Sequence, residues 1–203
     1  MEYRAVGKRC AVFMPSLNLP ISSSEALSAL LKKGFEVMEV NLINLARACV
    51  GTSVYRRGAR YSDAPTIVDC SSLIKWLYGQ RGVWLPRRSI QQRELGDGVS
   101  LDDITEGDVV FVSGWINYYL NDKADGVGHV GIYTAKGTVI HAADAESNVV
   151  ESPLESFIKN NKLRGIRRYI QRDVLTLEIP EDRDIEIADD IRWIILQSLP
   201  CER

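Results

Sequence analysis

The sequence predicts an α+β fold with an antiparallel sheet. Helical segments come first along the chain, and consecutive strands follow from Gly107 onward. Strands that follow one another directly pair as antiparallel hairpins, whereas a regular alternation of strands and helices would indicate a parallel sheet. At 203 residues the chain is long enough for one sizeable domain with a hydrophobic core and with extensions.

Three segments before residue 80 carry helical signals. Ser22-Ser23-Ser24-Glu25 fits a capping box, and the apolar stripe that follows it ends at Gly34. A second helix is expected from Asn41 to about Cys49, because apolar residues recur there at helical spacing. A third helix is expected after Asp69. Its buried side is predicted to hold Leu73, Ile74 and Leu77.

After Gly107 the pattern changes to short runs rich in β-branched residues, which predict strands. Ser152-Pro153-Leu154-Glu155 then predicts a short helix, with Ser152 as its N-cap and Pro153 at its first position. The predicted strands are 109–112, 127–134, 138–143, 148–151 and 163–170.

The composition changes near both ends of the chain. Residues 1–40 are interpreted as an N-terminal extension, and residues 173–203 as an acidic C-terminal extension with an amphipathic helix at 184–199. Eight acidic residues against one Arg between residues 173 and 190 mark this change. The central region, residues 41–172, is the predicted main domain.

Charge and hydropathy limit the partners. The net charge of −2 argues against an obligatory nucleic-acid or anionic-membrane partner. No run of 18 apolar residues is present, so no membrane span is predicted. The apolar run from Cys10 to Met14 is too short for a signal-peptide core. We therefore expect a cytoplasmic location or export by a non-Sec route.

The chain has four cysteines and two histidines. The cysteines are scattered without C-x-x-C spacing, which argues against a zinc ribbon and against a disulfide scaffold. No metal site and no cofactor are predicted, and any histidine chemistry must use His129 or His141.

Cys70 stands at the predicted start of the third helix. The free N–H groups and dipole of a helix N-terminus stabilise an anion, so we expect a lowered thiol pKa and a better nucleophile. The alternative is a buried core cysteine, which is the commoner case. Cys10, Cys49 and Cys201 lack this context and are interpreted as core or surface residues.

His129 and His141 lie on two predicted strands joined by a short turn. If the turn has three residues, Thr134 pairs with Thr138 and His141 lies opposite Gly131. The histidines are then diagonal neighbours on one face, about 7–8 Å apart at the backbone, with no side chain of Gly131 between them. A turn of two or four residues would place them on opposite faces.

One thiol and two adjacent histidines can serve as a nucleophile, a base and an orienting residue. Cys70 would attack a carbonyl, and His129 would take the thiol proton and pass it to the leaving amine. His141 would accept a hydrogen bond from the other ring nitrogen of His129 and fix its tautomer.

An ordered series of further motifs surrounds these residues. The motifs are Asp69-Cys70-Ser71, Leu85-Pro86-Arg87-Arg88-Ser89, Glu106 to Phe111, Gly128 to Tyr133, Ile140-His141-Ala142 and Gly165 to Tyr169. This series, in this order, resembles the NlpC/P60 family of papain-like cysteine peptidases. The resemblance covers residues 41–171, and Gly51-Thr52-Ser53-Val54-Tyr55 is similar to the family's segment ahead of the nucleophile.

The resemblance implies a nucleophile helix packed on an antiparallel sheet and a catalytic domain at 41–172. It also implies hydrolysis of peptidoglycan stem peptides or their fragments, at the bond between the γ-carboxyl of D-glutamate and a diamino acid. Cys70 matches the nucleophile, His129 the base and His141 the third polar residue, while the backbone N–H of Cys70 would form part of the oxyanion hole. The matched substrate-binding positions are Tyr55, Asp69, Ser71 and Ser89.

Other interpretations of the residues remain open. Asp69 could be only a helix cap, Ser89 could cap a turn, and Tyr55 could be a core aromatic residue; Arg87 is expected to be an ion-pair partner. Ser72 stands where the family has Gly and is expected to crowd the helix packing. The segment 113–126, with Trp115, Tyr118 and Tyr119, could form a lid or cover the sheet edge.

Two other functions also fit the residues. An amidase or acyl transferase of the same fold would act on another substrate. A non-catalytic binding or structural module, such as a phage-tail or secretion component, would keep the fold without the chemistry.

Overall fold

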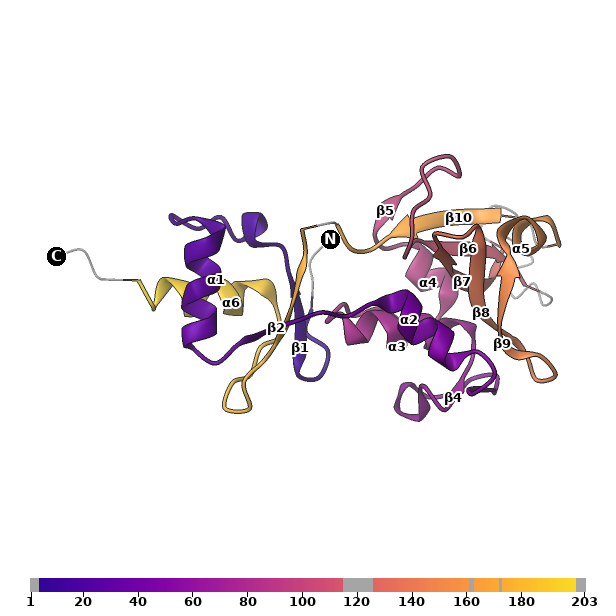
Figure 1. The fold of residues 1–203 in the computed structure, drawn as a ribbon, viewed down its shortest axis with the longest axis horizontal. Helices are drawn as coiled ribbons and strands as arrows, with labels where there is room; N and C mark the ends of the chain where they lie inside the picture. Colours follow the sequence, from indigo (N-terminus) through magenta and orange to yellow (C-terminus); the bar gives the residue numbers. More distant parts are fainter. Residues whose placement is uncertain (1–3, 115–125, 161–162, 172, 200–203) are drawn as a thin grey trace. The chain divides into compact units, whose positions relative to one another are not determined.

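The computed structural model describes residues 4–114, 126–160, 163–171 and 173–199. The chain divides into two compact units (Figure 1). The terminal unit combines residues 1–40, 79–84 and 171–203, and the central unit combines residues 41–78 and 85–170. Segments from both ends of the chain therefore belong to one unit.

A three-stranded antiparallel sheet with the order β1-β11-β2 forms the base of the terminal unit. β11 (Leu175–Glu178) lies in the middle, between β1 (Arg9–Val12) and β2 (Glu36–Met38). The sequence pattern does not predict these strands, because each has only three or four residues and β11 pairs with strands from the other end of the chain.

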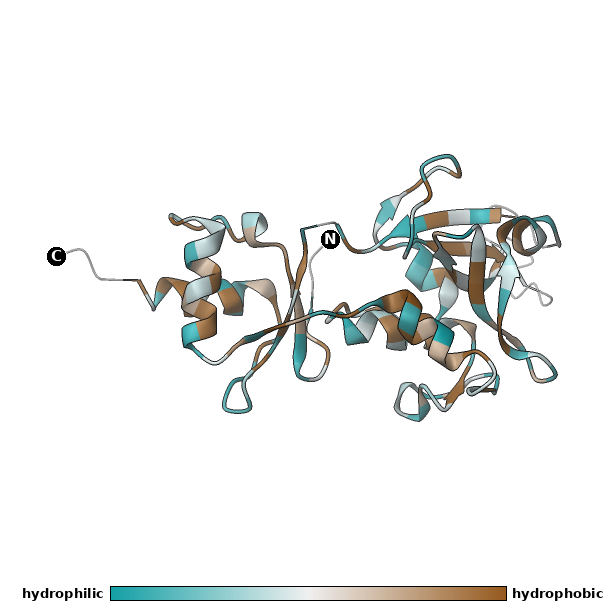
Figure 2. Cartoon of the chain, in the orientation of Figure 1, coloured by the Kyte–Doolittle hydropathy of each residue, from teal (hydrophilic) through white to brown (hydrophobic). Residues whose placement is uncertain are grey.

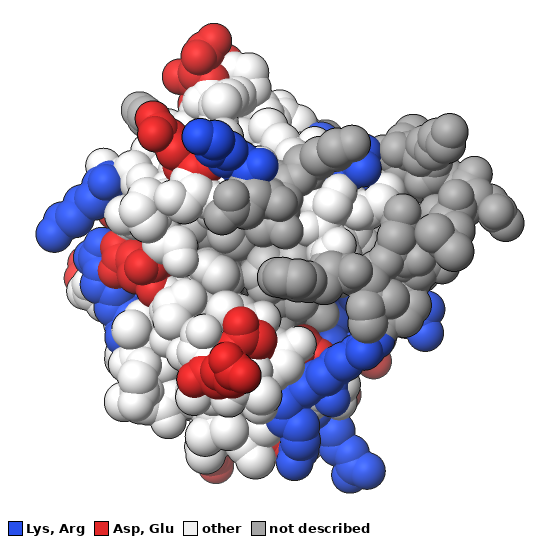
Figure 3. All heavy atoms as spheres, turned by 90° about the vertical axis from the view of Figure 1, so that its right-hand side faces the viewer, with Lys and Arg blue, Asp and Glu red and all other residues white. Residues whose placement is uncertain are grey.

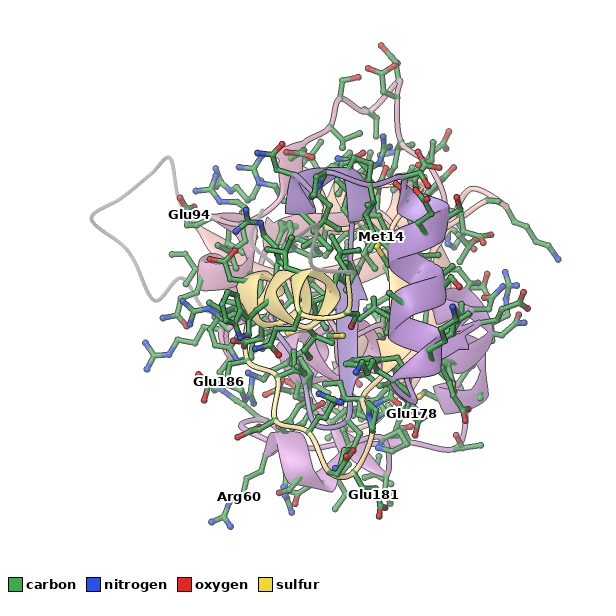
Figure 4. The ribbon with its side chains drawn as sticks, turned by 90° about the vertical axis from the view of Figure 1, so that its left-hand side faces the viewer. Met14, Arg60, Glu94, Glu178, Glu181 and Glu186 are labelled. Atoms are coloured by element: carbon green, nitrogen blue, oxygen red, sulfur yellow. The ribbon has the colours of Figure 1, made fainter. Side chains whose placement is uncertain are left out.

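Three helical segments complete the terminal unit: η1 (Met14–Leu17), α1 (Ser23–Lys32) and α6 (Ala188–Leu196). The predicted capping box of α1 is confirmed, since the Ser22 N–H donates to the Glu25 carboxylate at 2.9 Å and the Glu25 N–H donates to Ser22 Oγ at 3.3 Å. Met14 packs into the core of this unit beside α1 (Figure 4). Other members of that core are Leu17, Ala26, Leu30, Leu177, Ile191 and Ile195.

The helix expected at 184–199 is shorter than predicted, because α6 begins only at Ala188. The Asp190 carboxylate accepts the backbone N–H groups of Glu186 and Ile187 at 2.9 and 3.0 Å. An acidic residue in the first turn that takes up the free N–H groups ahead of it fixes a helix start at this point.

The central unit contains a six-stranded sheet with the order β5-β10-β6-β7-β8-β9, and all neighbouring strands are antiparallel. This confirms the predicted α+β class. Figure 2 shows hydrophobic residues along the middle strands, where Val109 to Val112 are fully buried. The strands are β5 (Asp97–Gly98), β6 (Val109–Ser113), β7 (Val127–Thr134), β8 (Thr138–Asp144), β9 (Asn148–Pro153) and β10 (Leu163–Arg168).

Four α-helices begin among the described residues of the central unit, and the second and third predicted helices are found as α2 and α3. A two-stranded parallel pair of β3 and β4 leads directly into α3. The elements are α2 (Leu42–Cys49), β3 (Val54–Tyr55), η2 (Tyr61–Asp63), β4 (Ile67–Val68), α3 (Cys70–Gln80), α4 (Ser89–Arg93) and α5 (Leu154–Asn160).

Ser152 and Pro153 do not begin a helix, in contrast to the sequence prediction. They extend β9, where Ser152 pairs with Val139 and Pro153 pairs with Thr138, and α5 begins at Leu154. The backbone pairing of β9 with β8 therefore decides the conformation of these two residues, although their local sequence is typical of a helix start. This correction places the Ser152 side chain on the sheet.

The segment with Trp115, Tyr118 and Tyr119 lies outside the described residues, as does Cys201. Among the helices that the structure describes, none is long and apolar enough to cross a membrane. The face of the central unit in Figure 3 carries both acidic and basic side chains, and basic side chains gather at its lower right.

Candidate active site

The start of α3 is held by a reciprocal pair of hydrogen bonds. The Ser72 N–H donates to Asp69 Oδ1 at 2.8 Å, and the Asp69 N–H donates to Ser72 Oγ at 2.8 Å. Asp69 is thus the N-cap of the helix that begins with Cys70. The fully buried Ser72, expected to crowd the helix packing, instead completes this cap through its hydroxyl group.

Arg87 forms an ion pair, as the sequence predicts, and the structure identifies its partner as Asp69. Its guanidinium group holds both carboxylate oxygens of Asp69, with one contact at 3.1 Å, and also donates to Ser71 Oγ at 2.8 Å. The Gly58 N–H adds a bond of 2.9 Å to Asp69 Oδ2. Asp69 and Ser71 are therefore part of a network that fixes the first turn of α3.

Cys70 is the half-buried first residue of α3. The backbone N–H groups of Ser71 and Val130 point to its sulfur, which places the thiol against β7 at Val130, the residue that follows His129 in the chain. Burial and the charge of Asp69 raise the pKa of Cys70 to about 12, in contrast to the expected lowering. Desolvation and the adjacent carboxylate outweigh the N–H groups at the helix start and the charge of Arg87.

The structure brings His129 and His141 together on one face of the sheet. Thr134 pairs with Thr138 across a three-residue turn, which is the turn length for which the sequence predicts that the two histidines share a face. His129 Nε2 lies 2.9 Å from His141 Nδ1. A Cβ atom at Gly131 would lie 3.0 Å from the Cβ of His141, so the absence of a side chain at Gly131 gives this pair its room.

Two further residues, not predicted from the sequence, complete this face. Phe157 of α5 packs on both imidazole rings, with ring centroids 5.6 Å from His129 and 4.8 Å from His141. Ser152 Oγ lies 3.1 Å from His141 Nε2. The strand pairing of β9 with β8 is the signal that could have placed Ser152 beside His141.

Both histidines are held neutral in this environment. Burial, and then the neighbouring His141, lower the pKa of His129 to about 3, against the opposing charges of Asp144 and Asp69. Burial likewise lowers the pKa of His141 to about 4, with Asp144 acting in the other direction. Each ring therefore carries one N–H group at neutral pH, which suits a base and its orienting partner.

Tyr55 lies at the end of β3 and pairs with Val68, directly ahead of Asp69. Its backbone N–H donates to Asn148 Oδ1 at 2.9 Å, so it connects β4, just ahead of α3, with the first residue of β9. Burial, and then the charges of Cys70 and Asp69, raise the pKa of Tyr55. Ser89 is half-buried at the first position of α4, which contacts β7.

Within the ranges that the structure describes, no cluster of three or more His, Cys, Asp or Glu side chains could hold a metal ion.

Comparison with known proteins gives a consistent picture. The model of the NlpC/P60 family matches residues 52–168. The chain is 32% identical over 148 residues to the gamma-DL-glutamyl hydrolase of Bacillus subtilis, covering 72% of this chain and 32% of the relative. It is 31% identical over 103 residues to a gamma-D-glutamyl-L-lysine dipeptidyl-peptidase of Bacillus cereus, covering 50% of this chain and 29% of the relative.

A solved structure supports the same conclusion. The crystal structure of an NlpC/P60 family protein from Bacillus cereus superimposes with a TM-score of 0.54 at 25% identity, covering 67% of this chain and 42% of that chain. The chain spans about a third of the length of the two curated relatives. The match to the family model extends over more than half of the chain, and this chain therefore belongs to the NlpC/P60 family of papain-like cysteine peptidases.

Proposed function

We propose that the chain is a cysteine peptidase that hydrolyses peptidoglycan peptides, with Cys70 as nucleophile, His129 as base and His141 as orienting residue. The hydrogen bond between His129 and His141 is the observation that carries the proposal. The backbone N–H of Val130, the residue after His129, points to the Cys70 sulfur and supports it. A neutral His129 is able to accept the thiol proton, and His141 directs its tautomer.

The reaction has two halves. The Cys70 sulfur attacks the amide carbonyl while His129 takes the thiol proton, and His129 then gives that proton to the departing amine as the thioester forms. Water attacks the thioester with His129 as base, which releases the acid and restores the thiol. The backbone N–H of Cys70 is proposed as one donor to the oxyanion.

The substrate proposal is the bond between the γ-carboxyl of D-glutamate and a diamino acid. The two curated relatives are named as a gamma-DL-glutamyl hydrolase and a gamma-D-glutamyl-L-lysine dipeptidyl-peptidase. Both names refer to a γ-glutamyl group, which supports this choice. Tyr55, Asp69, Ser71 and Ser89 are proposed to bind the peptide; Tyr55, Asp69 and Ser71 lie around the start of α3.

We further propose residues 41–172 as the catalytic domain, with residues 1–40 and 173–203 as extensions. The central unit, 41–78 with 85–170, contains all three proposed catalytic residues. The terminal unit contains none of them.

Matched peptides test the bond specificity. We expect the purified chain to cleave γ-D-glutamyl-diaminopimelate and γ-D-glutamyl-lysine peptides, and to leave the α-linked and γ-L-glutamyl isomers intact. Mass spectrometry of the products identifies the bond that is cut. Cleavage confined to the isomers or to acyl esters would support an amidase or acyl transferase instead and would contradict the proposed specificity.

A further inference from the structure

His129 can accept a proton from Cys70 only if its own N–H group is on the other ring nitrogen. A neutral imidazole has one N–H and one lone pair. His129 Nε2 lies 2.9 Å from His141 Nδ1, so the productive arrangement has the N–H on Nε2 of His129 and the lone pair on Nδ1 of His141. Nδ1 of His129 then keeps its lone pair for the thiol proton.

The same reasoning fixes the proton of His141. If Nδ1 of His141 carries the lone pair, its single N–H group must be on Nε2. Nε2 lies 3.1 Å from Ser152 Oγ, which can accept this hydrogen bond. Without an acceptor, the Nε2–H group of this buried ring would have no hydrogen bond, and the Nε2–H tautomer of His141 would no longer be favoured. The other tautomer, with its N–H on Nδ1, cannot accept a hydrogen bond from His129.

We propose that Ser152 is a positioning residue, because its Oγ accepts the Nε2–H of His141 and so keeps the lone pair of His141 Nδ1 directed at His129. The proposal rests on the proposed function, since it assumes that His129 acts as the base. The chain of donors runs from His129 to His141 to Ser152, and Ser152 touches none of the reacting atoms.

The backbone supports this role. Ser152 pairs with Val139 and His141 pairs with Val150 on neighbouring strands, so Ser152 and His141 are diagonal neighbours on one face of the sheet. This is the same relationship that joins His141 to His129 across β7 and β8. Phe157 packs on both rings and restricts their rotation, which leaves the hydrogen bonds to decide which nitrogen is protonated.

The tautomer of His141 can be measured without a substrate. Nitrogen-15 NMR of the histidine-labelled wild-type chain should show His141 and His129 as Nε2–H tautomers. In Ser152→Ala we expect His141 to become a mixture of the two tautomers. A wild-type His141 in the Nδ1–H form overturns the proposal, whether or not any variant folds.

Kinetics of three variants separate positioning from packing. We expect Ser152→Ala to lower kcat about five- to tenfold with KM changed less than twofold, because one hydrogen bond is lost away from the substrate. Ser152→Thr keeps the hydroxyl group and should stay within about twofold of wild type. Ser156→Ala, on the exposed side of α5, is the matched control and should have wild-type kcat.

Two kinetic results contradict the proposal: an unchanged kcat in Ser152→Ala, or a loss in Ser152→Thr as large as that in Ser152→Ala. The second result would indicate a packing role. Failure of the proposed function is distinguishable, because it would appear as hydrolysis that persists in Cys70→Ala while the NMR result is unaffected.

Discussion

His129 Nε2 and His141 Nδ1 lie 2.9 Å apart, and their rings are nearly perpendicular, with an interplanar angle of 84°. The contact joins two strands diagonally across the position of Gly131. Both the proposed base and its orienting residue lie on strands. The geometry of the proposed site therefore depends on the strand register and not on a loop.

The space at Gly131 should therefore be essential. A Cβ atom there would lie 2.4 Å from Val139 Cγ1 and 3.0 Å from His141 Cβ, so Gly131→Ala must push one of them aside. We expect a loss of about 1–3 kcal/mol in the free energy of unfolding and a fall in kcat of at least about tenfold. Denaturant unfolding and peptide hydrolysis measure both effects.

The double variant Gly131→Ala/Val139→Ala provides the control. Removal of the Val139 methyl groups relieves the nearer clash. The double variant should therefore lose less free energy of unfolding than the two single variants lose together. Strict additivity would show that the two positions do not interact.

The buried neutral histidines predict a pH dependence of stability. The folded-state pKa values of about 3 for His129 and about 4 for His141 lie below the value of 6.5 expected when the chain is unfolded. Between pH 6.5 and 4 the unfolded chain binds more protons, so the free energy of unfolding falls as the pH drops. The slope is up to about 1.4 kcal/mol per pH unit for each histidine.

Urea unfolding at pH 7.5 and 5.0 tests this dependence, since most carboxylates titrate below that window. The double variant His129→Gln/His141→Gln should lose much less stability between the two pH values than wild type. An equal loss in both proteins would show that the histidines do not carry the effect.

Two arginine–aspartate pairs differ in burial, so we expect the loss of each pair to lower the free energy of unfolding by a different amount. Arg87 holds the buried Asp69, whereas Arg56 holds Asp63 at the surface. We expect Arg87→Met to cost about 1–3 kcal/mol and to lower activity, because Asp69 caps the helix of Cys70. Arg56→Met should cost less than about 1 kcal/mol. Equal losses in the two variants would contradict the role given to Arg87.

Part of this structure could be predicted from local sequence. The capping box at Ser22 and the three-residue turn between β7 and β8 are local signals, and both are present. The sheet of the terminal unit is not local, because β11 pairs with β1 and β2 from the opposite end of the chain. Pairings of such high sequence separation leave no periodic pattern in strands this short.

The site shows the same division. The contact between His129 and His141 follows from the register of β7 and β8. The position of Ser152 in β9 was not predicted, because the local sequence at Ser152 is typical of a helix start. The pKa of Cys70 could not be predicted from its position at a helix N-terminus. Its burial and the neighbouring Asp69 raise the pKa, and burial is a property of the folded chain.

Cysteine labelling tests the accessibility and the activation of the thiol. In a Cys201→Ser background, brief iodoacetamide treatment should modify Cys70 and spare Cys10 and Cys49, whose exposed fractions are 4% and 3%. Since the pKa of Cys70 is raised, the rate should continue to rise above pH 8. His129→Gln should slow the labelling near pH 7 by removal of the base. A labelling rate that reaches a plateau below pH 7 in wild type would contradict a neutral Cys70 thiol in the free protein.

The most direct measurement is the rate at which γ-D-glutamyl-diaminopimelate is hydrolysed by Cys70→Ala beside wild type and Cys49→Ala. All three proteins are first shown to be folded by circular dichroism. We predict that Cys70→Ala loses at least about 10³-fold in rate, since no other group replaces the nucleophile, and that Cys49→Ala keeps the wild-type rate. Hydrolysis by Cys70→Ala within tenfold of wild type would contradict the assignment of Cys70 as the nucleophile.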